Sequence, residues 1–127
     1  MTQPLGQRHW LITGASSGLG RALTVAALEA GDTVVAAMRR PERLDDLVAE
    51  NPESLLTIAF DVRNTESAPT VVEAAIGRFG RVDVLVNNGG VGQIGAAEEI
   101  DDTRLRDMLE QHVVGPAALT RAVLPHM

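Results

Sequence analysis

The chain has 127 residues, of which 45% are hydrophobic, and this is enough to bury the core of one domain. Its formal net charge of −6 argues against nucleic acid or an anionic membrane surface as a partner, because either would need a clustered basic face. Cysteine is absent, the N-terminus has no apolar signal segment and no apolar run approaches the roughly 20 residues of a membrane span, so we expect one cytoplasmic domain over residues 1–127.

Four short apolar segments alternate with segments of helical periodicity along the chain. The segments predicted as strands are 9–12, 33–38, 55–60 and 82–87, and the helical segments between them are 21–30, a stretch containing Leu44, Leu47 and Val48, and 68–79. The apolar runs are mostly continuous rather than alternating, as expected for parallel strands that are covered on both faces. Because crossovers between parallel strands are right-handed, this order predicts an α/β fold with a doubly wound parallel sheet of the Rossmann type.

A glycine-rich loop over 87–99 and a long helix over about 102–124 follow the last predicted strand. Gly115 and Pro116 fall inside this helix, but apolar periodicity resumes after them, so we expect them to bend the helix rather than end it. Strand 82–87 should lie inside the sheet with a fifth strand beside it, because an apolar edge strand would be a template for aggregation. One face of the long helix is predicted to carry Leu105, Met108, Leu109, His112, Val113 and Pro116.

The sequence TGASSGLG directly follows the first predicted strand. A strand that runs through a glycine turn into a helix brings free backbone N–H groups and the positive end of a helix dipole to one point, which suits a pyrophosphate. Gly14 permits the tight turn, Gly18 lets phosphates approach the backbone, and Gly20 lets the helix lie close against its strand. Ser16 and Ser17 supply hydroxyl donors. The alternative is an ordinary strand-to-helix turn; a P-loop is excluded because its lysine is missing.

The spacing T-G-x-x-x-G-x-G resembles that of the classical short-chain dehydrogenase/reductase family. Two further motifs carry the resemblance: Asp61-Val62 after the third predicted strand, and the sequence NNGG after the fourth, in order and at the usual separations. Segment 115–127 also resembles the fifth major helix of the family, so the similarity covers nearly the whole chain. It implies that residues 1–127 are the N-terminal, cofactor-binding half of an NAD(P)-dependent oxidoreductase, truncated before the catalytic strands.

The resemblance also assigns roles to individual residues. It implies that Asp61 and Val62 bind the adenine end of the cofactor, that Asn87 lies near the cofactor and that Asn88 braces the sheet; Asp61 has the alternative of a helix N-cap or loop carboxylate. Gly89 stands where the family usually has alanine, which loosens the backbone beside the nicotinamide ribose. The residues expected to bind the cofactor are Gly14, Ser16, Ser17, Gly18, Leu19, Gly20, Arg39, Asp61, Val62, Asn87, Gly89 and Gly90.

The end of the second predicted strand indicates which nicotinamide cofactor is bound. In NAD-binding folds of this type an acidic residue about twenty positions past the glycines holds the ribose 2′-OH, whereas NADP sites offer arginine to the 2′-phosphate. Here Met38 occupies the place of the acid and Arg39 follows it. Because guanidinium binds phosphate bidentately, we predict NADP(H) rather than NAD(H). The alternative is that Arg39 and Arg40 are solvated surface charges.

His112 stands where the family carries a catalytic-site asparagine. The resemblance implies that the position holds a water of a proton relay, largely through the backbone carbonyl, which histidine still supplies. The alternative is a packed helical histidine whose ring nitrogens are satisfied. No second histidine lies at metal-ligand spacing, so we predict no metal site.

Family chemistry also needs a serine and a Tyr-x-x-x-Lys motif, and this sequence has neither tyrosine nor lysine. We therefore expect residues 1–127 alone to be inactive, and the reactive groups to follow Met127. With them, the expected reaction interconverts a carbonyl and an alcohol on a small-molecule substrate by hydride transfer, in a homo-oligomer. Two alternatives stay open: a non-catalytic dinucleotide-binding module, and a doubly wound domain for another nucleotide-like ligand such as an adenosyl methyl donor.

Overall fold

The four predicted strands pair in one parallel sheet. In the computed structural model, which describes residues 6–127, the strands are β1 (His9–Thr13), β2 (Thr33–Met38), β3 (Leu55–Ala59) and β4 (Val84–Val86). Their order across the sheet is β3-β2-β1-β4. This order, with a helix between successive strands, confirms the predicted doubly wound α/β fold. Within residues 6–127, β4 forms one edge of the sheet and is shorter than its apolar run.

The predicted helices are present, the one over 68–79 with its predicted bounds and the others with shifted boundaries. They are α1 (Gly18–Glu29), α2 (Asp45–Glu50), α3 (Ala68–Phe79), α4 (Asp102–Leu109) and α5 (Gly115–Val123), and short 3-10 turns over Pro41–Leu44 and Thr65–Ser67 precede α2 and α3. Helix α1 begins three residues before the predicted start, so the last part of the glycine motif is its first turn. The backbone N–H groups at this helix end therefore belong to the motif itself.

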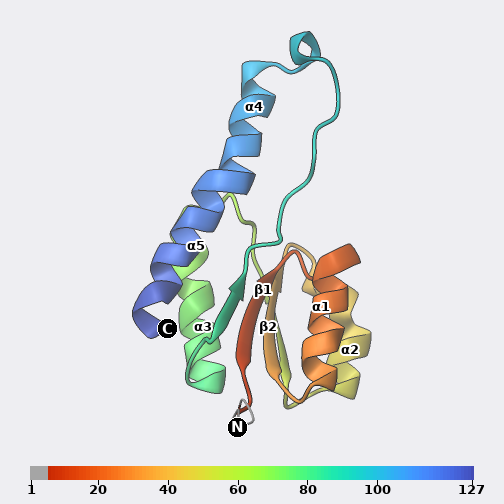
Figure 1. Cartoon of the computed structure of the whole chain (residues 1–127), viewed down its shortest axis with the longest axis vertical. Helices are drawn as coiled ribbons and strands as arrows, with labels where there is room; N and C mark the ends of the chain where they lie inside the picture. The colour runs from red at the N-terminus through yellow and green to blue at the C-terminus, as the bar shows by residue number, and fades with distance from the viewer. Residues whose placement is uncertain (1–5) are drawn as a thin grey trace, which may run out of the picture.

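Two separate cores cover the two faces of the sheet. Figure 1 shows α1 and α2 on one face and α3 and α5 on the other. Because successive side chains of a strand point to opposite faces, Leu11 and Val35 pack with α3 and α5, whereas Ile12 and Val34 pack with α1 and α2. The continuous apolar runs, which predicted strands covered by helices on both faces, therefore contribute side chains to both cores.

The predicted long helix contains a widened turn in its middle. The residues Glu110–Val114 form a π-helical turn between α4 and α5, directly before the Gly115-Pro116 pair that was expected to bend the helix. Figure 1 shows α4 extending beyond the end of the sheet. Along α4 and the π-turn, Leu105 is 52% exposed, Leu109 48% and Val113 56%. Part of the predicted apolar face is therefore uncovered. Among residues 6–127, no helix is both long enough and apolar enough to cross a membrane.

Candidate functional site

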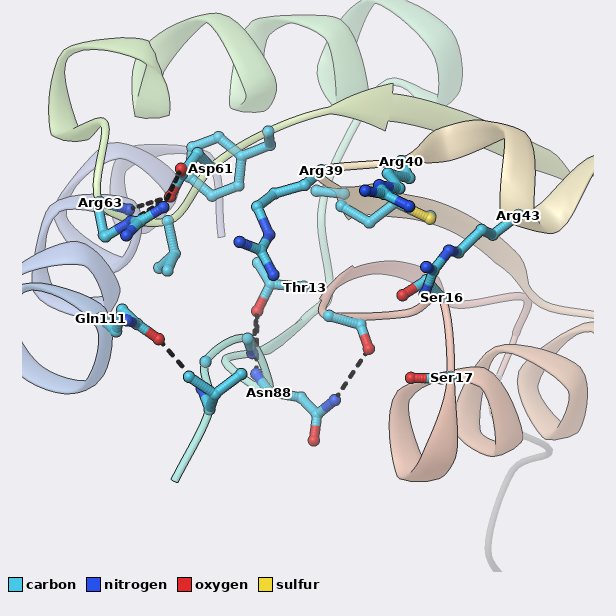
Figure 2. Close-up of a pocket in the computed structure, with 18 of the residues that line it drawn as sticks. Thr13, Ser16, Ser17, Arg39, Arg40, Arg43, Asp61, Arg63, Asn88 and Gln111 are labelled. Atoms are coloured by element: carbon cyan, nitrogen blue, oxygen red, sulfur yellow. Dashed lines mark hydrogen bonds and ion pairs between the residues drawn. The ribbon is translucent and has the colours of Figure 1, made fainter. Parts of the chain in front are cut away.

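A cavity of about 800 Å³ lies at the carboxyl ends of the strands. Its walls come from the glycine motif, the ends of β2 and β3, the loop after β4, and the helix that contains α4 and the π-turn (Figure 2). The carboxyl edge of a doubly wound sheet is where such folds bind ligands. The predicted site residues that line the cavity are Gly14, Ser16, Ser17, Arg39, Asp61, Val62, Gly89 and Gly90.

Five predicted site residues do not line this cavity: Gly18, Leu19, Gly20, Asn87 and His112. Gly20 lies behind the turn, where a Cβ would overlap the carbonyl oxygen of Gly14, so its glycine lets α1 approach the strand. Gly18 has a φ of +57°, and a Cβ there would meet no atom within 4 Å. Leu19 is 67% exposed. The side chain of Asn87 donates a hydrogen bond to Thr120 Oγ1 on α5 at 3.3 Å, away from the cavity.

Hydrogen bonds join the glycine turn to the loop after β4. Thr13 Oγ1 accepts from the backbone N–H groups of Asn88 and Gly89, both at 2.9 Å. The side-chain amide of Asn88 donates to the carbonyl oxygen of Gly14 at 3.3 Å. These contacts agree with the bracing role that the resemblance implied for Asn88. Thr13 was missed as a site residue, although a hydroxyl at the end of a buried strand needs a partner and signals such a contact.

The free hydroxyl groups of the glycine motif face the cavity. Ser17 is the N-cap residue of α1, but its side chain makes no capping hydrogen bond, so its hydroxyl remains available to a ligand. In Figure 2, Ser16 and Ser17 lie on the same side of the cavity. The first turn of α1 adds unpaired N–H groups and the positive end of the helix dipole. This wall of the cavity is therefore suited to an anion.

Three arginines that follow β2 make the adjoining wall positive. Arg39, Arg40 and Arg43 line the cavity, and none of them forms an ion pair within residues 6–127. In Figure 2, the side chain of Arg43 points toward Ser16, whereas Arg39 extends toward Thr13. Sequence reading missed Arg43. Its spacing from Arg40 was the available signal, because residues three apart share one side of a 3-10 turn.

Arg63 is a fourth arginine of the cavity and is paired with two carboxylates. Its Nε and Nη2 atoms donate to the two carboxylate oxygens of Asp61 at 3.1 and 2.9 Å, and its Nη1 atom donates to Asp107 Oδ1 at 3.0 Å. The hydrogen bonds from Arg63 hold the pKa values of Asp61 and Asp107 below their ordinary range. The carboxylates in turn raise the pKa of Arg63. Asp61 therefore carries a fixed negative charge at the end of β3.

Arg63→Met is expected to lower the free energy of unfolding at about pH 5 more than at about pH 2. Asp61 and Asp107 bind protons more weakly in the folded chain than in the unfolded chain, so their contribution is present above about pH 4 and is lost as pH falls through the lowered pKa values. Urea denaturation across this range measures the difference from the wild type. Arg104→Met, at an exposed position of α4, is the control. A pH-independent difference for Arg63→Met would contradict this assignment.

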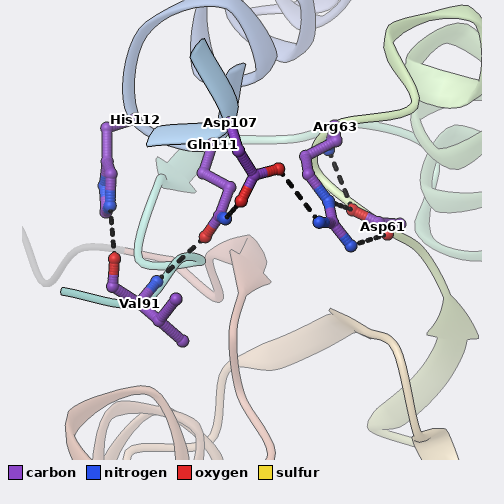
Figure 3. Close-up of polar contacts among 6 residues, drawn as sticks. All are labelled: Asp61, Arg63, Val91, Asp107, Gln111 and His112. Carbon is purple, nitrogen blue, oxygen red and sulfur yellow. Dashed lines mark hydrogen bonds and ion pairs between the residues drawn. The ribbon is translucent and has the colours of Figure 1, made fainter. Parts of the chain in front are cut away.

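The π-turn holds the loop after β4 by bonding to both backbone polar groups of Val91, its N–H and its carbonyl oxygen. Val91 N donates to Gln111 Oε1 at 3.1 Å, and the carbonyl oxygen of Val91 lies 2.8 Å from His112 Nε2 (Figure 3). Gln111 is only 7% exposed, while His112 is exposed. One ring nitrogen of His112 therefore has a partner, and the residue lies at the surface rather than in a core.

The backbone of His112 has a further property. In a regular α-helix its carbonyl would accept from the residue four positions later, but Pro116 has no N–H. His112 lies in the π-turn, however, where a carbonyl pairs with the N–H five positions later, which here belongs to Ala117. Within residues 6–127, no group of three or more histidine, aspartate or glutamate side chains could hold a metal ion.

Comparisons with known proteins match almost the whole chain. Residues 8–127 match the family model described as short chain dehydrogenase. The chain is 38% identical over 117 residues to Oxidoreductase BOA17 of Botryotinia fuckeliana, covering 91% of this chain and 43% of that protein. The chain thus spans less than half the length of this curated relative.

Solved structures share the same architecture. A short-chain dehydrogenase from Streptomyces avermitilis superposes with a TM-score of 0.91 and 53% sequence identity, over 94% of this chain and 44% of that chain. A 3-ketoacyl-(acyl-carrier-protein) reductase from Brucella melitensis, complexed with NADH, gives a TM-score of 0.87 and 32% identity, over 94% of this chain and 50% of that chain. In both neighbours the matched region is about half of the molecule.

Proposed function

Since this chain belongs to the short-chain dehydrogenase family, we propose that it is the cofactor-binding half of an NADP(H)-dependent oxidoreductase. The proposed reaction interconverts a carbonyl group and an alcohol on a small-molecule substrate. The observation that carries the cofactor preference is the cluster of Arg39, Arg40 and Arg43, which line one wall of the cavity without an ion-pair partner in the described part of the chain. Such a cluster favours a phosphate dianion over a ribose hydroxyl.

The residues around the glycine turn fit a dinucleotide. The N–H groups of the first turn of α1 and the uncommitted hydroxyl of Ser17, which lines the cavity, suit a pyrophosphate at the start of α1. Asp61 and Val62 would hold the adenine end, with Arg39 at the 2′-phosphate. Gly89 and Gly90 would line the nicotinamide end. The bound dinucleotide supplies the hydride donor or acceptor; the residues of this chain bind and orient it.

His112 is proposed to act through its backbone carbonyl. The support for this role is the position of His112, which matches that of the family's catalytic-site asparagine in the sequence. The ring of His112 contacts Val91 instead, so the side chain has a separate, structural use. We assign the general acid to residues outside this segment, since it contains no tyrosine or lysine.

The setting of the protein is also proposed. The net charge of −6 and the absence of cysteine support a cytoplasmic protein without nucleic-acid or membrane partners. The exposed Leu105, Leu109 and Val113 support a homo-oligomer in which this face of the helix is covered.

We expect the intact protein to bind NADPH at least tenfold more tightly than NADH, because a charge-assisted contact to the 2′-phosphate contributes roughly 1.5–3 kcal/mol. Fluorescence titration of both cofactors measures the ratio. Equal affinities, or a preference for NADH, would contradict the NADP(H) assignment, and no binding of either would remove the dinucleotide site. NADPH binding without carbonyl reduction across a panel of aldehydes and ketones would favour the alternative of a non-catalytic binding module.

A further inference from the structure

The loop after β4 has one attachment point on the helix side of the cavity. Its residues 91–99 are all exposed. On the sheet side, Asn88 and Gly89 are held through their N–H groups by Thr13 Oγ1. On the helix side, the loop is held at Val91, whose N–H donates to Gln111 Oε1 at 3.1 Å and whose carbonyl oxygen lies 2.8 Å from Nε2 of the exposed His112. The short segment between these two attachments lines the cavity.

Gln111 is the buried partner in this attachment. It is 7% exposed, and both ends of its side-chain amide are used: Oε1 accepts from Val91, and Nε2 donates to Asp107 Oδ2 at 2.7 Å. An ionised carboxylate is an acceptor only, so Asp107 fixes which end of the amide faces it. The other end, the oxygen, must then face the loop. Asp107 therefore sets the orientation that Val91 requires.

Arg63 extends this series of hydrogen bonds from Asp107 to the loop after β3, which forms another wall of the cavity. It donates to Asp107 Oδ1 at 3.0 Å and to both oxygens of Asp61. The two oxygens of Asp107 thus serve different partners, Arg63 and Gln111 (Figure 3). The loop after β3 and the loop after β4 are connected through one carboxylate on α4.

We propose that Gln111, oriented by Asp107 and Arg63, is a positioning residue that fixes the segment 89–91 at one end of the cavity. Resting on the proposed function, this is the end that receives the nicotinamide. Gln111 itself need not touch the cofactor, since its polar atoms are bonded to Val91 and Asp107. Its loss should therefore act through the loop.

Gln111→Met in the intact protein tests the proposal, because methionine keeps the size of the side chain and removes both hydrogen bonds. The amide hydrogen of Val91, followed by NMR-detected exchange in the free protein, is expected to exchange about fivefold faster. The affinity for NADPH is expected to fall about threefold to tenfold, while the affinity for adenosine 2′,5′-bisphosphate, which lacks the nicotinamide half, stays unchanged.

Asp107→Asn tests whether Asp107 orients the Gln111 amide. It also replaces Gln111→Met as the test if that variant does not fold, because the side chain of Asp107 is 44% exposed and its substitution should be tolerated. An asparagine has one acceptor oxygen, so it cannot accept from Arg63 and Gln111 through two oxygens, and Val91 exchange should again accelerate. Glu110→Gln, at an exposed position of the same π-turn, is the matched control and should leave exchange unchanged.

The outcomes separate this inference from the proposed function. Val91 exchange that is equal in Gln111→Met, Asp107→Asn and the control would overturn the positioning role, whether or not NADPH binds. An equal loss of affinity for NADPH and adenosine 2′,5′-bisphosphate would also overturn it, because it would show general damage to the site. If Val91 exchange accelerates as expected but the wild type binds no nicotinamide dinucleotide, Gln111 does position the loop. In that case the proposed cofactor is wrong.

Discussion

Gly18→Val is expected to lower the affinity for NADPH at least about a hundredfold while the sheet still forms. Gly18 does not line the cavity, but it follows Ser17, which does, and a Cβ at position 18 meets no protein atom within 4 Å. We therefore propose that the new side chain extends over the N–H groups at the start of α1 that we assign to the pyrophosphate. The position also has a φ of +57°, which a β-branched residue adopts only with strain of about 1–3 kcal/mol. Fluorescence titration gives the affinity, and circular dichroism reports the fold.

Gly31→Val separates the strain from the blocked space. Gly31 follows the opposite end of α1 and has a φ of +85°, and a Cβ there would likewise meet no atom within 4 Å. Its substitution therefore imposes comparable backbone strain far from the cavity, and NADPH binding should persist. If Gly18→Val bound NADPH as well as Gly31→Val does, the glycine motif would be only a turn.

Arg39→Ala is expected to remove most of the preference for NADPH, a loss of about ten- to a hundredfold in NADPH affinity, and to leave NADH affinity nearly unchanged. The physical reason is that only NADPH carries the 2′-phosphate. Arg39 extends across the cavity toward Thr13, apart from Arg40 and Arg43, so its removal leaves the other two in place (Figure 2). Titration of both cofactors against the variant measures the change.

The neighbouring arginines give this experiment its controls. Arg121→Ala, at an exposed position of α5, should change neither affinity. Arg43→Ala tests whether the phosphate lies nearer to Ser16 than to Thr13. A preference for NADPH that survives Arg39→Ala but disappears in Arg43→Ala would contradict the assignment of the phosphate to Arg39.

The architecture was predictable because its signals are local. Each strand is an apolar run that is bounded by glycine or polar residues, and each helix has its own apolar periodicity. The element order and the parallel sheet can therefore be predicted from short stretches of sequence. The boundaries were less accurate. Helix α1 takes in the end of the glycine motif, and β4 keeps only Val84–Val86 of its apolar run. Hydrogen bonding across the sheet sets such limits, and a single segment does not contain that information.

The candidate site was predictable only where a motif marks it. The glycine turn, Asp61 and Arg39 lie together at the cavity, but the contacts among Arg63, Asp107 and Gln111 were not foreseen. Arg63 and Asp107 are 44 positions apart, so only the packed fold brings them together. His112 illustrates the same limit: the sequence did not indicate that its exposed ring contacts the carbonyl of Val91, and its role in a proton relay stays a prediction.

The strand order has a consequence for how the site assembles. Strand β1 pairs with β2 across 24 positions, as in His9 with Thr33, whereas Thr13 reaches the N–H of Asn88 across 75 positions. Closing the longer loop costs more chain entropy, so β1, β2 and β3 can associate before β4 joins them. The wall formed by the loop after β4 then comes last. A partly folded chain would contain most of the sheet and no complete cavity, so that ligand binding would report completion of the fold, while spectroscopic strand content would not.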